Sequence, residues 1–381
     1  MTRSNIVTLW CAFLVIEVVA FVNAYLVNLK GGTIDAVRFQ EAATRWAIDG
    51  EFVFAVNSEF FVQYLGLIYR FFGPHEFIAT QFGILAALIS VLIFIRLLYR
   101  LSLPCPDLAI LAFLLWPSML LRVTTTLREP YMILAIILAF YALVRFSQTR
   151  HLGYAVISLA ALLVGALFHK AIAVMVPFAL FAISAMLLSA QRGLEIRKTS
   201  LLGFGMFVIG LLILVEFAAT PSEVRGLKPL QSLLVWDTDH ITNVLDYKTG
   251  REFRTTYSAS LQFGSPLVFL RSGVEVVIAY IFMPFPWFIR HPLDLFAFSE
   301  VLFRLGGIFL IIRFGFTKPG MPRALRPLWI LTALLICIWA AGTSNYGTGS
   351  RHHLTTNWVF LLAYIACFSV QRPMTTDRLT V

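Results

Sequence analysis

Charged residues are scarce in this chain. Asp, Glu, Lys and Arg together make up 13% of its 381 residues, about half of what soluble domains carry. Apolar residues make up 59% of the chain, and the mean hydropathy is +0.82. Because a soluble fold cannot hide so much apolar surface from water, we expect an all-α protein that crosses a lipid bilayer many times.

Cysteine is also scarce. The four cysteines show no C-x-x-C spacing; three lie in apolar runs and one lies in a short proline-rich turn. The sequence therefore predicts neither a disulfide framework nor a cysteine metal cluster.

Apolar runs of the length of a membrane span recur along the chain. A span needs about 20 residues, since a helix rises 1.5 Å per residue and the hydrocarbon core is about 30 Å thick. We expect about ten transmembrane helices, within a range of nine to eleven, in a single transmembrane domain that covers residues 1–381. The predicted spans are 6–28, 77–99, 107–122, 130–146, 152–168, 171–190, 200–219, 297–314, 327–342 and 354–370.

Two apolar segments have a second interpretation. The first run could be a signal peptide cut after Ala24, but Glu17 interrupts it and apolarity continues to Leu29, which favours a span. Residues 264–289 are interrupted by Arg271, Gly273 and Glu275. We expect this segment to be re-entrant or interfacial, although a broken pair of half-helices would also fit.

The distribution of positive charge predicts the orientation. If the N-terminus is inside, the inner loops carry fourteen cations and three acids, against sixteen cations and seventeen acids in the rest of the chain. This bias indicates a multi-pass protein of the plasma (inner) membrane with cytoplasmic N- and C-termini. The net charge of +10 is then a topology signal, and we expect no nucleic-acid partner. The inner cations are Arg3, Arg96, Arg100, Arg145, Arg150, Arg192, Arg197, Lys198, Arg313, Lys318, Arg323, Arg326, Arg372 and Arg378.

The outer side is expected to hold two larger segments. Residues 29–76 form the first outside loop, which we expect to contain amphipathic helices. Residues 220–296 form a long second loop that includes the interfacial segment 264–289. Apolar residues recur at helical spacing from Ile34 to Trp46, as in a helix that lies at the membrane surface.

Asp35 is the candidate catalytic residue. It falls in the first turn of this amphipathic helix, where the helix dipole favours a carboxylate. Asp35 could simply stabilise the start of the helix. It could also act as a general base held at the depth of the lipid headgroups.

Other ionisable groups are predicted on the same face. Arg128 and Glu129 precede the fourth span, and His169 and Lys170 occupy a tight turn. Arg351 follows the residues "GTGS" in a turn whose backbone amides could cradle an anion. Arginines and lysines can bind phosphate oxygens, but the same side chains could also be ordinary surface charges. Glu41, His352 and His353 are further supporting candidates. Adjacent histidines point different ways on a helix, so the metal ligands stay unknown.

The order of these parts resembles the GT-C superfamily of integral-membrane glycosyltransferases. "DAVRFQEAATRWAIDG" looks like the acidic first-loop element of that family, with Asp35 at the acidic position, and "NSEFFVQYLGLIYRFFG" is similar to its interfacial helix. "TLREP", "GTGSRHH" and "PFPW" resemble segments of sugar transferases and polymerases from bacterial exopolysaccharide clusters. The first loop lacks the D-x-D pattern, and we expect no large C-terminal soluble domain of the kind that oligosaccharyltransferases carry.

The resemblance implies a transferase that uses a polyprenyl-phosphate-linked sugar as donor and a glycan or a lipid-linked molecule as acceptor, with membrane lipid around it. Asp35 would act as the base, while Arg128, Lys170 and Arg351 would bind the substrate phosphate. A divalent cation, Mg²⁺ or Mn²⁺, could share that work. A polymerase of lipid-pyrophosphate-linked repeat units is one alternative, and cations within residues 225–254 would suit it. A lipid or solute transporter is the other.

Overall fold

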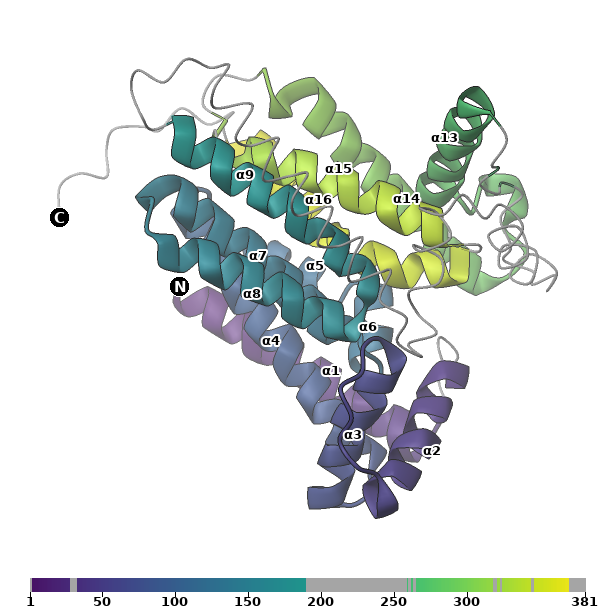
Figure 1. Cartoon of the computed structure of the whole chain (residues 1–381). Coiled ribbons are helices and arrows are strands. Elements are labelled where there is room, and N and C mark those ends of the chain that lie inside the picture. Colours follow the sequence, from purple (N-terminus) through teal and green to yellow (C-terminus); the bar gives the residue numbers. More distant parts are fainter. Residues whose placement is uncertain are drawn as a thin grey trace.

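The computed structural model describes residues 2–27, 33–189, 259, 262, 265–317, 321–322, 324–343 and 346–369. Their regular elements are helices, which run mostly in one direction (Figure 1). The first half contains α1 (Arg3–Tyr25), α2 (Thr33–Asp49), α3 (Ser58–Phe72), α4 (Glu76–Arg100), α5 (Asp107–Leu114), α6 (Pro117–Val123), α7 (Glu129–Thr149), α8 (Leu152–Phe168), η1 (Lys170–Val174) and α9 (Met175–Ser189). The second half contains α13 (Pro266–Phe282), η2 (Pro286–Phe288), α14 (Pro292–Leu310), η3 (Ile311–Gly315), α15 (Leu325–Gly342) and α16 (Tyr346–Ser369).

Six helical stretches of the described residues are long and apolar enough to cross a membrane, and a shorter apolar helix, α8, accompanies them. The chain is therefore a multi-pass helical membrane protein. The predicted count of about ten spans is not confirmed, and the predicted span 200–219 lies outside the described residues. The six are Arg3–Tyr25, Glu76–Arg100, Glu129–Thr149, Lys170–Leu187, Asp294–Gly315 and Leu325–Gly342.

The predicted span 107–122 is wrong in form, because two short helices replace it. Helix α5 ends at Leu114 and α6 begins at Pro117. Trp116 before the proline is extended (φ −55°, ψ 132°), as expected when a proline ring crowds the residue before it. This break brings Ser118 and Arg122 of α6 into the interior, where both are buried.

The C-terminal helix also begins earlier than the sequence predicts. Residues 347–353, "GTGSRHH", were expected to form a turn whose amides cradle an anion, but they are the first turns of α16. Arg351, His352 and His353 consequently leave the helix in different directions. Helix α16 is not among the six spans.

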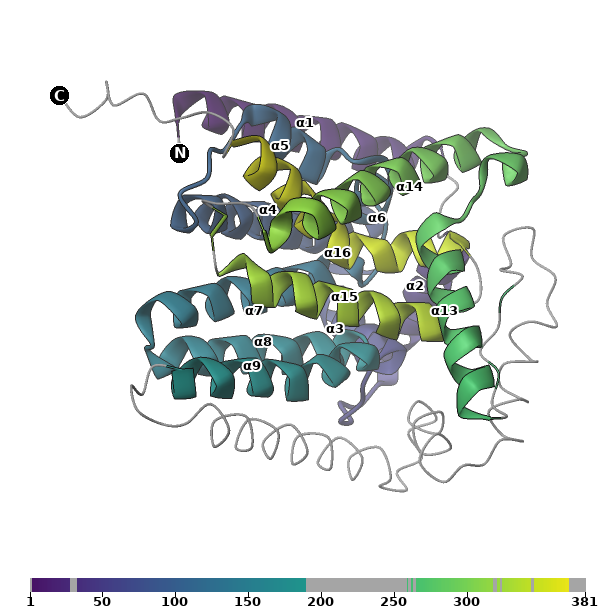
Figure 2. The ribbon, with the colours of Figure 1, turned by 90° about the horizontal axis from the view of Figure 1, so that it is seen from above.

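The segment 264–289 contains a single helix, α13, followed by the short η2. Figure 2 shows α13 running across the common direction of α7, α8, α9 and α15. Its length of 17 residues and this orientation suit a helix that lies along a membrane surface.

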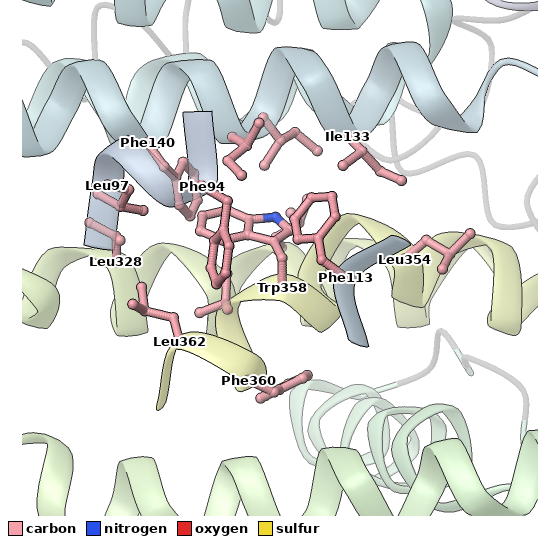
Figure 3. Packing of buried hydrophobic residues seen from close by; sticks show 14 of the residues in the cluster. Phe94, Leu97, Phe113, Ile133, Phe140, Leu328, Leu354, Trp358, Phe360 and Leu362 are labelled. Atoms are coloured by element: carbon pink, nitrogen blue, oxygen red, sulfur yellow. The ribbon is translucent and has the colours of Figure 1, made fainter. Parts of the chain in front are cut away.

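The core lies between α4, α5, α7 and α16. Trp358 of α16 stands at its centre with the Phe94 ring 6.4 Å and the Phe140 ring 5.6 Å away, both edge-on (Figure 3). The surrounding aliphatic side chains, including Leu97 and Leu362, are fully buried. Such contacts add packing energy within the bilayer, where lipid tails are as apolar as leucine.

Helices α2 and α3 form a separate packed pair at one end of the bundle (Figure 1). Arg70 of α3 stacks on the ring of Trp46 at 4.8 Å and donates to the carbonyl of Gly50 at 2.7 Å, which closes the end of α2. At Gly66 of α3, an added Cβ would lie 2.4 Å from the Trp46 ring. Only glycine permits this close approach, so Gly66 sets the position of the helix that carries Asp35.

We expect Gly66→Ala to lower the thermal unfolding midpoint of the detergent-solubilised protein, because overpacking a tight contact costs about 1–3 kcal/mol. Gly342→Ala is the matched control, since an added Cβ there meets nothing within 4 Å. Equal midpoints for the two variants would show that α2 and α3 do not pack this closely.

Candidate functional site

The end of the bundle that α2 and α3 cover carries a cluster of charged side chains. Arg351 of α16 donates through Nη1 to the carboxylate of Asp35 on α2, and through Nε to Oε1 of Glu129 at 2.5 Å. Glu129 is the first residue of α7. One guanidinium therefore joins three helices that lie far apart in the sequence. The structure thus brings the predicted catalytic residue into contact with one of the predicted phosphate-binding residues.

The two carboxylates differ in exposure. The Glu129 side chain is 2% exposed, whereas the Asp35 side chain is 44% exposed. Arg351 is 11% exposed. Glu129 thus balances a buried cation, which would otherwise be costly in a low-dielectric interior. Asp35 is the carboxylate of this cluster that a substrate can reach.

Arg128 is committed to protein acceptors. Its Nη1 donates to the side chain of Asn57, to Oγ of Ser58 at 3.3 Å and to the carbonyl of Phe168 at 3.2 Å. Burial lowers the pKa of Arg128, and the carboxylate of Glu129 opposes that effect. Arg128 therefore fastens the start of α3 to the end of α8. Any role in binding substrate phosphate would compete with these bonds.

Asn57, which accepts a hydrogen bond from Arg128, has an uncommon backbone conformation. Its φ of 68° is uncommon for a residue with a side chain, and its N–H donates to the Leu167 carbonyl at 2.6 Å. Two further bonds join the same end of the bundle: Asn23 to the Thr124 carbonyl at 2.9 Å, and Gln40 to Thr126 at 2.7 Å. The segment between α6 and α7 is thus held by α1 and α2.

His169 and His352 flank a buried tryptophan. The ring of His352 is stacked on Trp339 at 4.2 Å, and His169 meets Trp339 edge-on at 4.5 Å. Thr343 donates to the Trp339 carbonyl at 2.7 Å and lies 2.8 Å from Nδ1 of His352. The hydroxyl carries one proton, so Nδ1 of His352 donates to Thr343 when that proton bonds to the carbonyl.

The remaining predicted residues occupy different surroundings. The charges of Lys170, Arg128 and Arg351 all act on His169, so Lys170 belongs to the same electrostatic cluster. His353 points elsewhere, since its Nε2 lies 2.9 Å from the Tyr280 carbonyl on α13. Glu41 is exposed on α2. Adjacent histidines do diverge on the helix, as expected.

Sequence reasoning missed a buried arginine in this cluster. Arg122 on α6 is 7% exposed and lies within electrostatic range of Glu129, Glu300, Asp35 and Arg351. Glu300, whose Oε1 accepts from the Ser118 N–H at 3.2 Å, faces Arg304 one turn further along α14 at 3.8 Å. Glu300 and Arg304 thus form a buried ion pair on one face of α14. Arg122 was not singled out from the sequence because it was the last residue of the predicted apolar span 107–122. A charged residue within a span is itself a sign of function.

The carboxylates of the described cluster lie beside arginines. No group of three or more His, Cys, Asp or Glu side chains with metal-binding proximity occurs among the residues that the structure describes. Asp35 and Glu129 both bond to the guanidinium of Arg351, which takes the place of a cation.

A small cavity lies between α5, α6, α7, α14 and α16. Its volume of about 30 Å³ suits one or two water molecules, and its lining includes Trp116 and Asn357. The indole Nε1 and both amide atoms of these two residues are buried without a hydrogen-bond partner among the described residues. The cavity is too small to hold a sugar.

The fold and this cluster define a class: a multi-pass helical membrane protein with a charged site at one end of its bundle. Comparisons with protein-family models, with curated proteins and with solved structures give no match for the chain.

We expect the two carboxylates to differ in their effect on stability. Glu129→Gln leaves a buried guanidinium without its counter-charge, and breaking such a pair costs about 3–5 kcal/mol. Asp35→Asn removes a half-exposed partner, for which about 0–1 kcal/mol is typical. Thermal unfolding in detergent measures both. A larger loss for Asp35→Asn would contradict the assigned roles.

Acidification should also destabilise the protein through His169. Burial, together with the charge of Arg128, lowers the pKa of His169 well below its ordinary value. The unfolded chain then binds an extra proton at His169 as the pH falls below about 6.5, so stability is lost in that range and unaffected above it. Nδ1 of His169 also accepts the Ala171 N–H at 3.3 Å, and protonation removes that acceptor.

We expect His169→Asn to weaken the fall of the unfolding midpoint between pH 7 and pH 5. His151→Asn is the matched control, because exposed His151 makes the same kind of cap to the Gly153 N–H at 3.2 Å. The interpretation fails if His151→Asn flattens the pH profile as much as His169→Asn.

Proposed function

We propose that the protein is a membrane glycosyltransferase of GT-C type. It moves a sugar from a polyprenyl-phosphate-linked donor to a glycan or lipid-linked acceptor on the outer face of the plasma membrane. The observation that carries the proposal is the half-exposed Asp35 carboxylate, which is fixed by Arg351 at the end of the bundle where Arg128 and Lys170 also lie.

The chemistry needs a proton acceptor and a cationic environment. Asp35 takes the proton of the acceptor hydroxyl while that oxygen bonds to the anomeric carbon of the sugar. The bond from this carbon to the phosphate oxygen breaks, and its electron pair stays on the lipid phosphate. Arg351, Arg128 and Lys170 then supply the positive field that stabilises the leaving group.

The placement of this cluster suits a lipid-linked substrate. A donor with a polyprenyl tail keeps the tail in the bilayer and presents its phosphate at headgroup depth. Helices α2 and α3 cover this end of the bundle and would limit water access to the donor, which would otherwise be hydrolysed. Residues 225–254, whose cations would suit a repeat-unit polymerase, lie outside the described part of the chain.

A transporter is the second candidate, and one observation favours it. Glu300 and Arg304 face each other in the middle of α14 and are each about 3% exposed. Buried ionisable pairs within spans often mark the route of an ion or a substrate. Transport without sugar transfer by the protein in liposomes would support this candidate.

The test of the transferase proposal is Asp35→Asn in cells whose surface glycan depends on this protein. We expect at least a hundredfold loss of product and an accumulation of lipid-linked intermediates, since a positioned base contributes about 10²–10⁴-fold. Asp49→Asn is the matched control, because Asp49 is exposed at the far end of the same helix.

The chain length of the product separates the two enzymatic alternatives. A transferase adds one sugar, whereas a polymerase gives a ladder of repeat units. Normal product from a well-expressed Asp35→Asn variant would rule out Asp35 as the base.

A further inference from the structure

Arg122 is a buried arginine with two nitrogen atoms that make no hydrogen bond in the described structure. Its Nε and Nη1 atoms are buried and have no hydrogen-bond partner among the residues that the structure describes. Guanidinium donors in an interior are ordinarily paired, because desolvation without a partner is costly. The residue is only 7% exposed, so bulk water does not supply the missing acceptors.

The groups around Arg122 do not use its donors. Ser118 precedes it by four residues on α6 and therefore lies on the same helix face, but Ser118 bonds to Glu300 through its backbone N–H and its side chain. Oε2 of Glu129, within electrostatic range of Arg122, is buried without a hydrogen-bond partner in the described structure, so Glu129 does not bond to Arg122 either. Nε and Nη1 of Arg122 are thus left for a ligand that brings its own acceptors.

The neighbouring arginines already donate hydrogen bonds to protein acceptors. Arg351 already donates to two carboxylates, and Arg128 donates to Asn57, Ser58 and the Phe168 carbonyl. From the sequence we predicted that both arginines bind phosphate, yet both donate to protein acceptors. Arg122 has donors to offer without breaking an existing bond.

The charge of the cluster points to an anionic ligand. Its five cations outnumber its three carboxylates, which leaves a net charge of +2 among the described residues. An excess of positive charge around the buried Arg122 favours the binding of an anion beside it. The cations are Arg122, Arg128, Lys170, Arg304 and Arg351, and the carboxylates are Asp35, Glu129 and Glu300.

We infer that Arg122 binds the phosphate of the lipid-linked donor, with its Nε and Nη1 donating to phosphate oxygens. This inference rests on the proposed function. A sugar phosphodiester carries one negative charge, and the phosphate monoester released by transfer carries about two at pH 7. The net charge of the cluster therefore matches the leaving group better than the donor, as differential stabilisation of the transition state requires.

The experiment measures binding separately from transfer. Farnesyl phosphate, farnesol and inorganic phosphate are titrated against the full-length protein in detergent. We expect wild-type protein to bind farnesyl phosphate more tightly than either other probe. Arg122→Gln should weaken farnesyl phosphate binding at least about tenfold, because a hydrogen bond to a charged group is lost. Arg96→Gln, at an exposed arginine of α4, should leave binding unchanged.

Each outcome decides one of the two claims. If Arg122→Gln binds farnesyl phosphate as tightly as wild-type protein, the inference fails and the proposed function stands. If wild-type protein does not prefer farnesyl phosphate to farnesol, the proposed function fails with it. Equal binding of inorganic phosphate would contradict a lipid-linked ligand.

A second variant covers a failure of Arg122→Gln to fold. Arg122→Lys keeps the charge but cannot donate two bonds in a fork, so we expect binding several-fold weaker than wild type. Unchanged affinity in the lysine variant would overturn the assignment.

Discussion

One guanidinium joins three helices at one end of this protein. Arg351 lies on the last described helix, yet its two bonded partners belong to the amphipathic helix near the N-terminus and to the start of α7. A cation that is only 11% exposed must be compensated by charge, because its solvation by water is largely lost. That requirement fixes which helices meet, and it holds the half-exposed Asp35 beside the bundle.

Side chains of alternating charge continue from Arg351 into the bundle. Arg351 is followed by Glu129, then Arg122, Glu300 and Arg304, which come from four different helices. In a lipid environment such a series is expensive unless it is used, so ionisable groups inside a membrane protein are a sign of function. The series has two chemically distinct parts. One is the half-exposed carboxylate of Asp35, and the other is the pair of unbonded donors of Arg122 further inside the bundle. We assign the first to proton transfer and the second to phosphate binding.

Much of this arrangement could be predicted from hydropathy and charge alone. Alternating spans return the chain to the same face, so Asp35, Glu129, His169 and Arg351 were expected together before any contact was known. The contact between Asp35 and Arg351 was not predictable, since it depends on how α2 packs against the bundle. The close contact between Gly66 and the Trp46 ring helps to position α2, and hydrophobic periodicity does not reveal it.

The errors of the sequence analysis have physical causes as well. We predicted a single span across Pro117, although helical backbone is disfavoured at the residue before a proline. Arg122 was consequently counted as the end of a span rather than as a buried charge. The glycines at 347 and 349 suggested a turn, but tertiary packing against α15 and α7 extends α16 through them.

The central claim is that Arg351 and Glu129 depend on each other, and a double-mutant cycle tests it most directly. Thermal stabilities of Glu129→Gln, Arg351→Gln and the double variant are compared with wild type in the same detergent. The account predicts that the double variant loses less stability than the two single losses added together, because each single change strands a buried charge. Strict additivity of the two losses would show that the two side chains do not interact, and would contradict the account.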